Sequence, residues 1–166
     1  MTDATSSQTQ PTFAEFFPVP DEARRLDRFL GTWRVKGVLT VEGDDLPMTG
    51  EWRFTAAAAG WGVAGALAAH VEGLGSYEEH DLVGFDIETG LYHVYSLTNS
   101  AAVHDHVARW RAEGGLEFEF TGLQGGKPYR EIGAVEFRSD GSMHLTSEDY
   151  VDGTLASRMA VDLIRV

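Results

Sequence analysis

Cysteine is absent from this sequence of 166 residues, which excludes disulfide bonds and thiolate metal sites. Basic residues are scarce, because 13 Lys and Arg stand against 26 Asp and Glu and give a net charge of -13. Nucleic acids and anionic membranes are bound mainly through Lys and Arg, so neither is predicted as a partner. The acidity by itself indicates solubility.

Long hydrophobic runs are missing as well. No apolar run approaches the ~20 residues that cross a bilayer as a helix. Residues 1–13 lack the basic and apolar regions of a secretory signal. The cytoplasm is therefore the expected location. No nucleophile elbow, phosphate loop or dinucleotide fingerprint is present, so no cofactor is predicted.

The chain divides into an arm and one domain. Residues 1–20 are polar and then rich in proline, without periodicity, and predict a disordered or loosely docked arm. The arm contains three aromatic residues that could dock on the domain or on a partner: Phe13, Phe16 and Phe17. A homodimer is therefore one possible assembly. Residues 21–166 predict a single domain, a size that buries roughly 70% of the unfolded surface. It opens with a short helix over 21–30, capped by Asp21.

Turn residues recur about every ten positions from residue 32 onward, which is typical of hairpin-connected strands. The predicted strands cover 32–42, 48–57, 61–72, 77–85, 91–98, 103–111, 116–122, 129–138, 142–150 and 154–165. The third is rich in Ala and Gly, a composition that also suits a helix. The predicted fold class is all-β, a closed antiparallel barrel of about ten strands.

The first and last strands of this barrel are expected to lie side by side. Alternation on the first strand points Trp33 inward, and alternation on the last strand places Arg165 on the same apolar face. Closure brings the last strand beside the first. We therefore expect the guanidinium of Arg165 to stack on the indole of Trp33.

Turn lengths predict which residues face each other across the hairpins. A three-residue turn at 139–141 pairs Phe137 with Met143 and places Glu131 opposite Asp149 on the inward face. A similar turn at 151–153 predicts pairs between Leu145 and Met159 and between Ser147 and Ser157. A turn at 112–114 predicts pairs between Trp110 and Leu116 and between Ala108 and Phe118. The last register also turns His104 and His106 inward.

The opening Gly31-Thr32-Trp33, with Arg165 in the last strand, resembles the Gly-x-Trp signature of the calycin superfamily of lipocalins and fatty-acid-binding proteins. The hairpin Val83-Gly84-Phe85-Asp86 to Leu91-Tyr92 resembles a bacterial lipocalin-like family of unknown function. The resemblance covers about residues 22–166. It departs at Thr98-Asn99-Ser100, where members of that family tend to carry an Asp. The resemblance implies a barrel with a lumen for hydrophobic molecules, and related barrels include isomerases and cyclases.

His104-Asp105-His106 places two imidazoles on one face of a strand. This spacing suits a metal, but the remaining cupin residues are missing and a third ligand would have to come from His93. No metal is therefore predicted. Hydrogen bonds to a ligand, a general base and an ordinary structural role remain open for both histidines.

Glu131 and Asp149 form the second candidate group. Two carboxyl groups in an apolar lumen push their pKa values apart, which could supply a general acid. The alternative places both at a wet barrel mouth, paired with Lys127 or Arg130.

The predicted function is intracellular binding of a small hydrophobic or aromatic molecule in the lumen. The predicted ligand-binding residues are Tyr95, His93, His104, His106, Trp110, Phe118, Phe120, Glu131 and Asp149. The alternative is an isomerase, cyclase or lyase acting on an apolar, polyketide-like metabolite, with His104, His106, Glu131 and Asp149 as its catalytic residues. A third hypothesis is a haem carrier with His93, His104 or His106 as the axial ligand.

Overall fold

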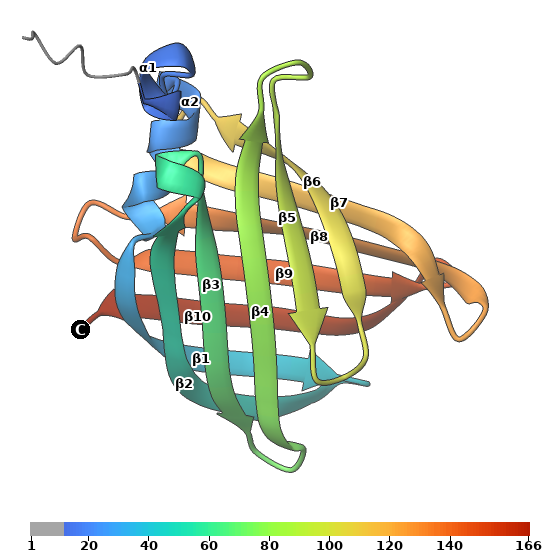
Figure 1. Cartoon of the computed structure of the whole chain (residues 1–166). Helices are drawn as coiled ribbons and strands as arrows, with labels where there is room; N and C mark the ends of the chain where they lie inside the picture. Colours follow the sequence, from blue (N-terminus) through green and yellow to red (C-terminus); the bar gives the residue numbers. More distant parts are fainter. Residues whose placement is uncertain (1–11) are drawn as a thin grey trace, which may run out of the picture.

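The computed structural model describes residues 12–166, and its strands form a closed antiparallel barrel (Figure 1). Each strand pairs with its neighbours in the sequence, and β1 pairs with β10 to close the wall. The strands are β1 Gly31–Val41, β2 Asp44–Ala57, β3 Gly62–Val71, β4 Gly75–Asp86, β5 Leu91–Thr98, β6 Val103–Arg111, β7 Gly115–Gln124, β8 Lys127–Phe137, β9 Met143–Val151 and β10 Thr154–Arg165. The predicted fold class is confirmed, and the Ala- and Gly-rich segment is a strand.

Short helical segments lie at one end of the barrel (Figure 1). They are α1 Phe13–Phe16, α2 Asp21–Arg24 and the 3-10 helix η1 Arg25–Phe29, while a further 3-10 turn, η2 Ala58–Gly60, joins β2 to β3. Leu26 and Phe29 of η1 are buried in the core of the barrel. The helical end is thereby plugged.

The helix predicted over residues 21–30 is present, but it tightens into η1 after a single α-helical turn. Pro20 occupies the N-cap, and Asp21 is the first helical residue. The predicted cap is therefore displaced by one residue. Residues 1–11 of the predicted arm lie outside the described residues, and residues 12–20 include α1.

Trp33 and Arg165 hold the first and last strands together. They are paired in register, and the guanidinium carbon lies 4.3 Å from the centre of the indole ring. Trp33 is only 1% exposed, and its Nε1 donates a 2.6 Å hydrogen bond to the carbonyl of Phe29. Arg165 Nη1 donates at 2.7 Å to the carbonyl of Leu30. The expected stacking is confirmed, and it also fastens the plug to both strands.

Gly31 has a steric reason to be glycine. Its φ is +122°, and a Cβ atom there would lie 2.7 Å from Nη1 of Arg165. Any side chain would therefore displace the guanidinium from the carbonyl of Leu30. The glycine of the Gly-x-Trp signature thus makes room for the arginine that covers its tryptophan.

Two of the predicted hairpin registers are confirmed. Phe137 pairs with Met143, and Glu131 pairs with Asp149. Across the hairpin of β6 and β7, Trp110 pairs with Leu116. Ala108 likewise pairs with Phe118.

The register predicted for the last hairpin is wrong by two residues. Leu145 pairs with Val161, and Asp149 pairs with Ser157. The turn is the two-residue Asp152-Gly153, and a β-bulge between Leu155 and Ser157 adds the remaining shift. A shift of two residues leaves each side chain on its predicted face, so the inward set survives the error.

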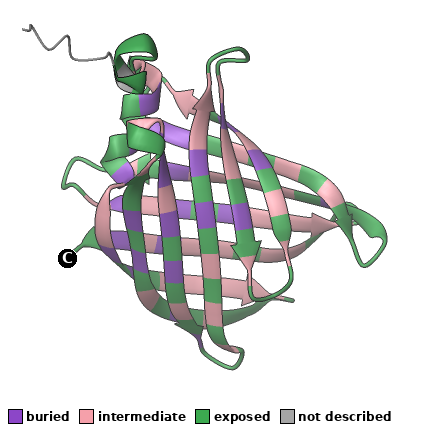
Figure 2. Cartoon of the chain, viewed as in Figure 1, coloured by how far each residue is buried: buried purple, intermediate pink, exposed green. Residues whose placement is uncertain are grey.

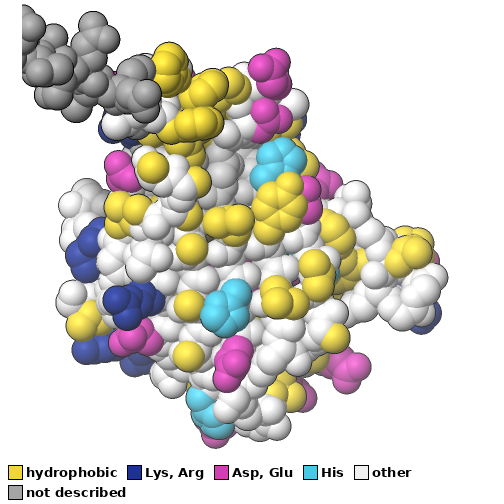
Figure 3. Space-filling view, in the orientation of Figure 1, with side chains coloured by type: hydrophobic (Ala, Val, Ile, Leu, Met, Phe, Trp, Pro, Cys, Tyr) yellow, Lys and Arg dark blue, Asp and Glu magenta, His cyan; other side chains and the backbone are white. Residues whose placement is uncertain are grey.

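Burial follows the alternation of the strands (Figure 2). Buried positions gather toward the helical end, where Trp33, Phe29 and Leu163 belong to the same apolar cluster. Exposed apolar side chains gather over the N-terminal helices (Figure 3), and Phe13 is 83% exposed. Within residues 12–166, no helix has the length and apolarity that crossing a membrane requires.

Trp33 and Arg165 together form a latch between β1 and β10. Replacing Trp33 should therefore lower the stability of the barrel. We expect Trp33→Ala to lower the free energy of unfolding by about 3–5 kcal/mol, because it empties a buried aromatic site. Tyr95→Ala is the matched control, since this aromatic side chain is 52% exposed on the outer face. Urea unfolding followed by circular dichroism measures both, and equal losses in the two variants would contradict the latch.

Candidate functional site

The barrel encloses a cavity of about 590 Å³. It extends from Phe29 at the plugged end to Leu74 and Ser100 in turns at the opposite end, beside Gln124 at the end of β7. A ten-stranded barrel is too wide for its own side chains to fill, which accounts for the space. The apolar part of the lining includes Leu39, Val41, Met48, Trp52, Val71, Phe118, Leu145 and Met159.

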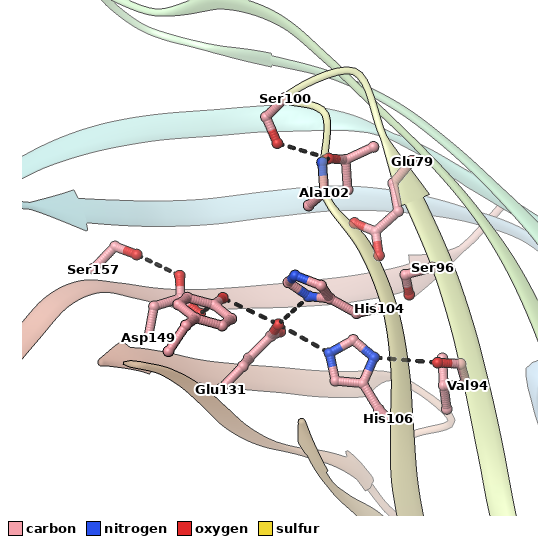
Figure 4. Close-up of polar contacts among 12 residues, drawn as sticks. Glu79, Val94, Ser96, Ser100, Ala102, His104, His106, Glu131, Asp149 and Ser157 are labelled. Atoms are coloured by element: carbon pink, nitrogen blue, oxygen red, sulfur yellow. Dashed lines mark hydrogen bonds and ion pairs between the residues drawn. The ribbon is translucent and has the colours of Figure 1, made fainter. Parts of the chain in front are cut away.

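Glu131 of β8 is the centre of a polar cluster in this lining. Its Oε2 lies 2.9 Å from Nε2 of His106 and 3.1 Å from Nδ1 of His104. Both imidazoles come from β6 and turn toward the carboxylate (Figure 4). His104 is held from the side by Phe120, whose ring stacks on it with centroids 4.0 Å apart.

Hydrogen bonding indicates which ring nitrogen of His106 carries a proton. Its Nδ1 lies 3.2 Å from the carbonyl of Val94, which can only accept, so Nδ1 carries a proton. Burial by itself would lower the pKa of His106, but the bond to Glu131 and the attraction of its charge raise that pKa overall. Burial likewise opposes ionisation of Glu131, yet His106 and His104 lower its pKa overall. Both shifts favour an imidazolium beside a carboxylate.

Asp149 extends the cluster toward β9 and β10. It accepts hydrogen bonds from the Ser157 hydroxyl and, at 2.8 Å, from the Tyr129 hydroxyl. That hydroxyl also lies 3.3 Å from Oε2 of Glu131. Burial and the negative charge of Glu131 raise the pKa of Asp149 despite these bonds. Two neighbouring carboxyl groups thus have pKa values shifted in opposite directions.

A second polar group lies on β4 and β5. Asp81 accepts a 2.6 Å hydrogen bond from Ser96, and Glu79 accepts one of 2.7 Å from Tyr77. Asp81 is 7% exposed, and its pKa is raised well above the usual range by burial first and then by the charge of Glu79. Burial and this charge both favour the protonated form of Asp81. Glu79 faces the same space as His104 (Figure 4).

Gly65 of β3 makes room for two polar atoms on the wall. A Cβ there would lie 3.0 Å from Nε1 of Trp52 and 3.1 Å from Oδ2 of Asp81. These are the two buried side-chain atoms without a hydrogen-bond partner among the described residues. One is a donor and the other belongs to a carboxyl group, and both lie beside the same glycine.

The structure brings together the four residues proposed from the sequence as candidate catalytic groups: His104, His106, Glu131 and Asp149. Phe118 lines the cavity, and Phe120 supports His104. Arg130 pairs with Glu119 on the outer surface at 2.8 Å, so it does not neutralise the inward carboxylates.

Four of the predicted ligand-binding residues are not among those that line the cavity: Tyr95, His93, Trp110 and Phe120. Tyr95 is 52% exposed, and His93 bonds Asp105 at 2.9 Å on the outer face. Tyr95 pairs with Asp105 across β5 and β6, which places both side chains on the outer face. Trp110 points inward but stacks on Phe137 near the plugged end, outside the cavity lining.

His93 therefore does not lie where a third ligand to His104 and His106 would have to lie. Glu131 is the residue beside these two imidazoles. The three donor atoms lie within 4.8 Å of one another. Sequence reasoning also missed Tyr77, Glu79 and Asp81. Both faces of β4 carry polar residues, so alternation does not tell which face points into the lumen. The pairing of Asp81 with Gly65 in the structure shows which one does.

Comparison with known protein families and with curated proteins finds no match. Among solved structures, one similar chain is in the structure of EF1p2_mFAP2b bound to DFHBI, at 14% identity and a TM-score of 0.42. The alignment covers 87% of this chain and 99% of that chain. At this TM-score the likeness decides neither fold nor function. The observed barrel fits a calycin-like architecture, and membership of a lipocalin-like family stays a prediction.

Asp81 should make stability depend on pH. Its folded pKa is raised, so the folded chain keeps a proton that the unfolded chain releases above about pH 4. Stability from this group therefore falls as pH rises above 4. We expect the free energy of unfolding of Asp81→Asn to rise relative to that of the wild type between pH 5 and pH 8, measured by urea unfolding.

Asp140→Asn is the control of opposite sign. The Ser142 hydroxyl and backbone N–H lower the pKa of Asp140, so its contribution is present at neutral pH and fades as pH falls. The same pH response in both variants would contradict the assignment of Asp81.

Proposed function

We propose that this barrel binds a small hydrophobic or aromatic molecule in its lumen. The supporting observation is the cavity of about 590 Å³, which is mostly apolar and carries a few fixed polar groups on one side. Ligand sites in proteins commonly have this size and this mixture. The cytoplasmic location and the homodimer stay predictions.

The charges of the lining narrow the class of ligand. Glu79, Asp81, Glu131 and Asp149 line the cavity, whereas no Lys or Arg does so among the described residues. A carboxylate would have to enter beside these acidic groups without a Lys or Arg partner, which costs free energy. The preferred guest is therefore neutral or cationic, with an apolar body against Leu39 and Met48. A haem, with two carboxylates, fits this lining poorly.

Binding can be tested with two fluorescent probes of different charge. The neutral N-phenyl-1-naphthylamine should bind the full chain at least tenfold more tightly than cis-parinaric acid, which carries a carboxylate. Fluorescence titration measures both dissociation constants. Tighter binding of the acid would contradict the charge argument, and failure of both probes to bind would contradict the proposal.

A filled-lumen variant gives the matched comparison. Leu39→Trp places a large side chain in the cavity lining and should abolish binding of the neutral probe. Leu97→Trp makes the same change at a side chain that is 53% exposed, and it should bind normally. Equal loss in both variants would indicate unfolding and not occupation of the lumen.

A second candidate function is catalysis of an isomerisation, cyclisation or elimination on an apolar guest. The observation that favours it is the opposite pKa shift of Glu131 and Asp149, which lie across the hairpin of β8 and β9. Such a pair can supply one base and one acid near neutral pH. Asp149 would donate the proton, while Glu131 or an imidazole would accept one.

Once native mass spectrometry identifies a guest, its turnover can be followed. Glu131→Gln and Asp149→Asn should each lower kcat by about 10²–10⁴-fold, the usual contribution of a general acid or base. Asp162→Asn, which changes a carboxylate on the outer face bonded to His144, should leave turnover unchanged. Full turnover in both lumen variants would exclude acid–base catalysis here and leave the binding proposal standing.

A further inference from the structure

His104, His106 and Glu131 form a set of converging donors that neither candidate function requires as a unit. One oxygen, Glu131 Oε2, faces both His104 Nδ1 and His106 Nε2, at 3.1 and 2.9 Å. The three residues come from two strands of a closed wall, so the barrel itself fixes their spacing. All three line the cavity.

These separations are close to those of a tetrahedral metal centre. Two ligand atoms at about 2.0–2.1 Å from a zinc ion lie about 3.3 Å apart. The two measured nitrogen-to-oxygen distances are slightly shorter than this, and all three donor atoms lie within 4.8 Å. An ion between them would replace the protons that the imidazoles now donate to Glu131, with only small side-chain movements.

The surroundings orient the donors as metal ligands are oriented. Nδ1 of His106 is bonded to the carbonyl of Val94, which leaves Nε2 directed at the cluster. A backbone carbonyl on the other ring nitrogen is the usual partner of a metal-bound histidine. The His104 ring is fixed by Phe120, and the hydroxyl of Tyr129 lies 3.3 Å from the carboxylate.

We propose that His104, His106 and Glu131 bind a divalent transition metal ion, with its remaining coordination positions open to the lumen. Two imidazoles and one carboxylate suit Zn²⁺, Fe²⁺ or Co²⁺ better than Mg²⁺ or Ca²⁺, which prefer oxygen ligands. Glu79 and Asp149 face the same cavity and make it favourable for a cation when ionised. An open position lets the ion bind a neutral guest through oxygen or nitrogen, or polarise it.

Metal alone tests this site, without any organic guest. The full chain, stripped with a chelator, should bind one Zn²⁺ per molecule in isothermal titration calorimetry. Co²⁺ should give visible absorption bands typical of a low-coordinate nitrogen and oxygen site. His104→Ala and Glu131→Gln should each weaken Zn²⁺ binding at least tenfold.

Two histidines on the outer face provide the controls. The double variant His93→Ala/His144→Ala removes two imidazoles that bond carboxylates on the outer face, and it should bind Zn²⁺ as the wild type does. Circular dichroism should show that each variant is folded, and nitrogen NMR of the wild-type imidazoles reports ligation without any substitution. No Zn²⁺ binding by wild type, or unchanged binding in both lumen variants, would overturn the proposal. Binding of the probe dyes is independent of this result.

Discussion

The contact between β1 and β10 is the constraint on which the rest of this structure depends. It turns a sheet of consecutive hairpins into a closed wall without edges, and it fixes how wide that wall is. Arg165 secures it by covering Trp33 and by bonding the carbonyl of Leu30, which also holds the helical plug in place. The width of the wall leaves an interior space. The plug covers one end of that space, and turns line the other end.

The same closure explains how four carboxyl and two imidazole side chains can lie inside a mostly apolar lining. Burying a carboxylate is costly unless it is paired, and strand register supplies the partners. Glu131 and Asp149 are opposite each other because β8 and β9 pair, and the alternation of β6 directs His104 and His106 at the same carboxylate. Asp81 has no cationic partner among the described residues, and burial raises its pKa instead. The cluster is therefore ordered before any guest or ion arrives.

Turn chemistry and alternation predicted much of this arrangement. Short Gly-containing turns define the register of a hairpin, so the inward direction of Glu131 and Asp149 followed from the residues alone. The bulge after Leu155 could not be predicted, because no glycine or proline marks it. Tyr95 was misplaced because aromatic character does not tell which face of a strand a residue occupies. The contact between Glu131 and both imidazoles needed the curvature of the barrel, which sequence spacing does not contain.

The latch also has a consequence for the order of folding. Strands β1 to β9 pair with neighbours made immediately before or after them, so their hairpins can form while the chain is being synthesised. The bond from Arg165 to Leu30 spans 135 residues and can form only when residue 165 has left the ribosome. Until then the apolar lining of the lumen faces the cell, and an open edge is available to other chains. The growing chain is therefore most exposed to aggregation just before its last strand arrives.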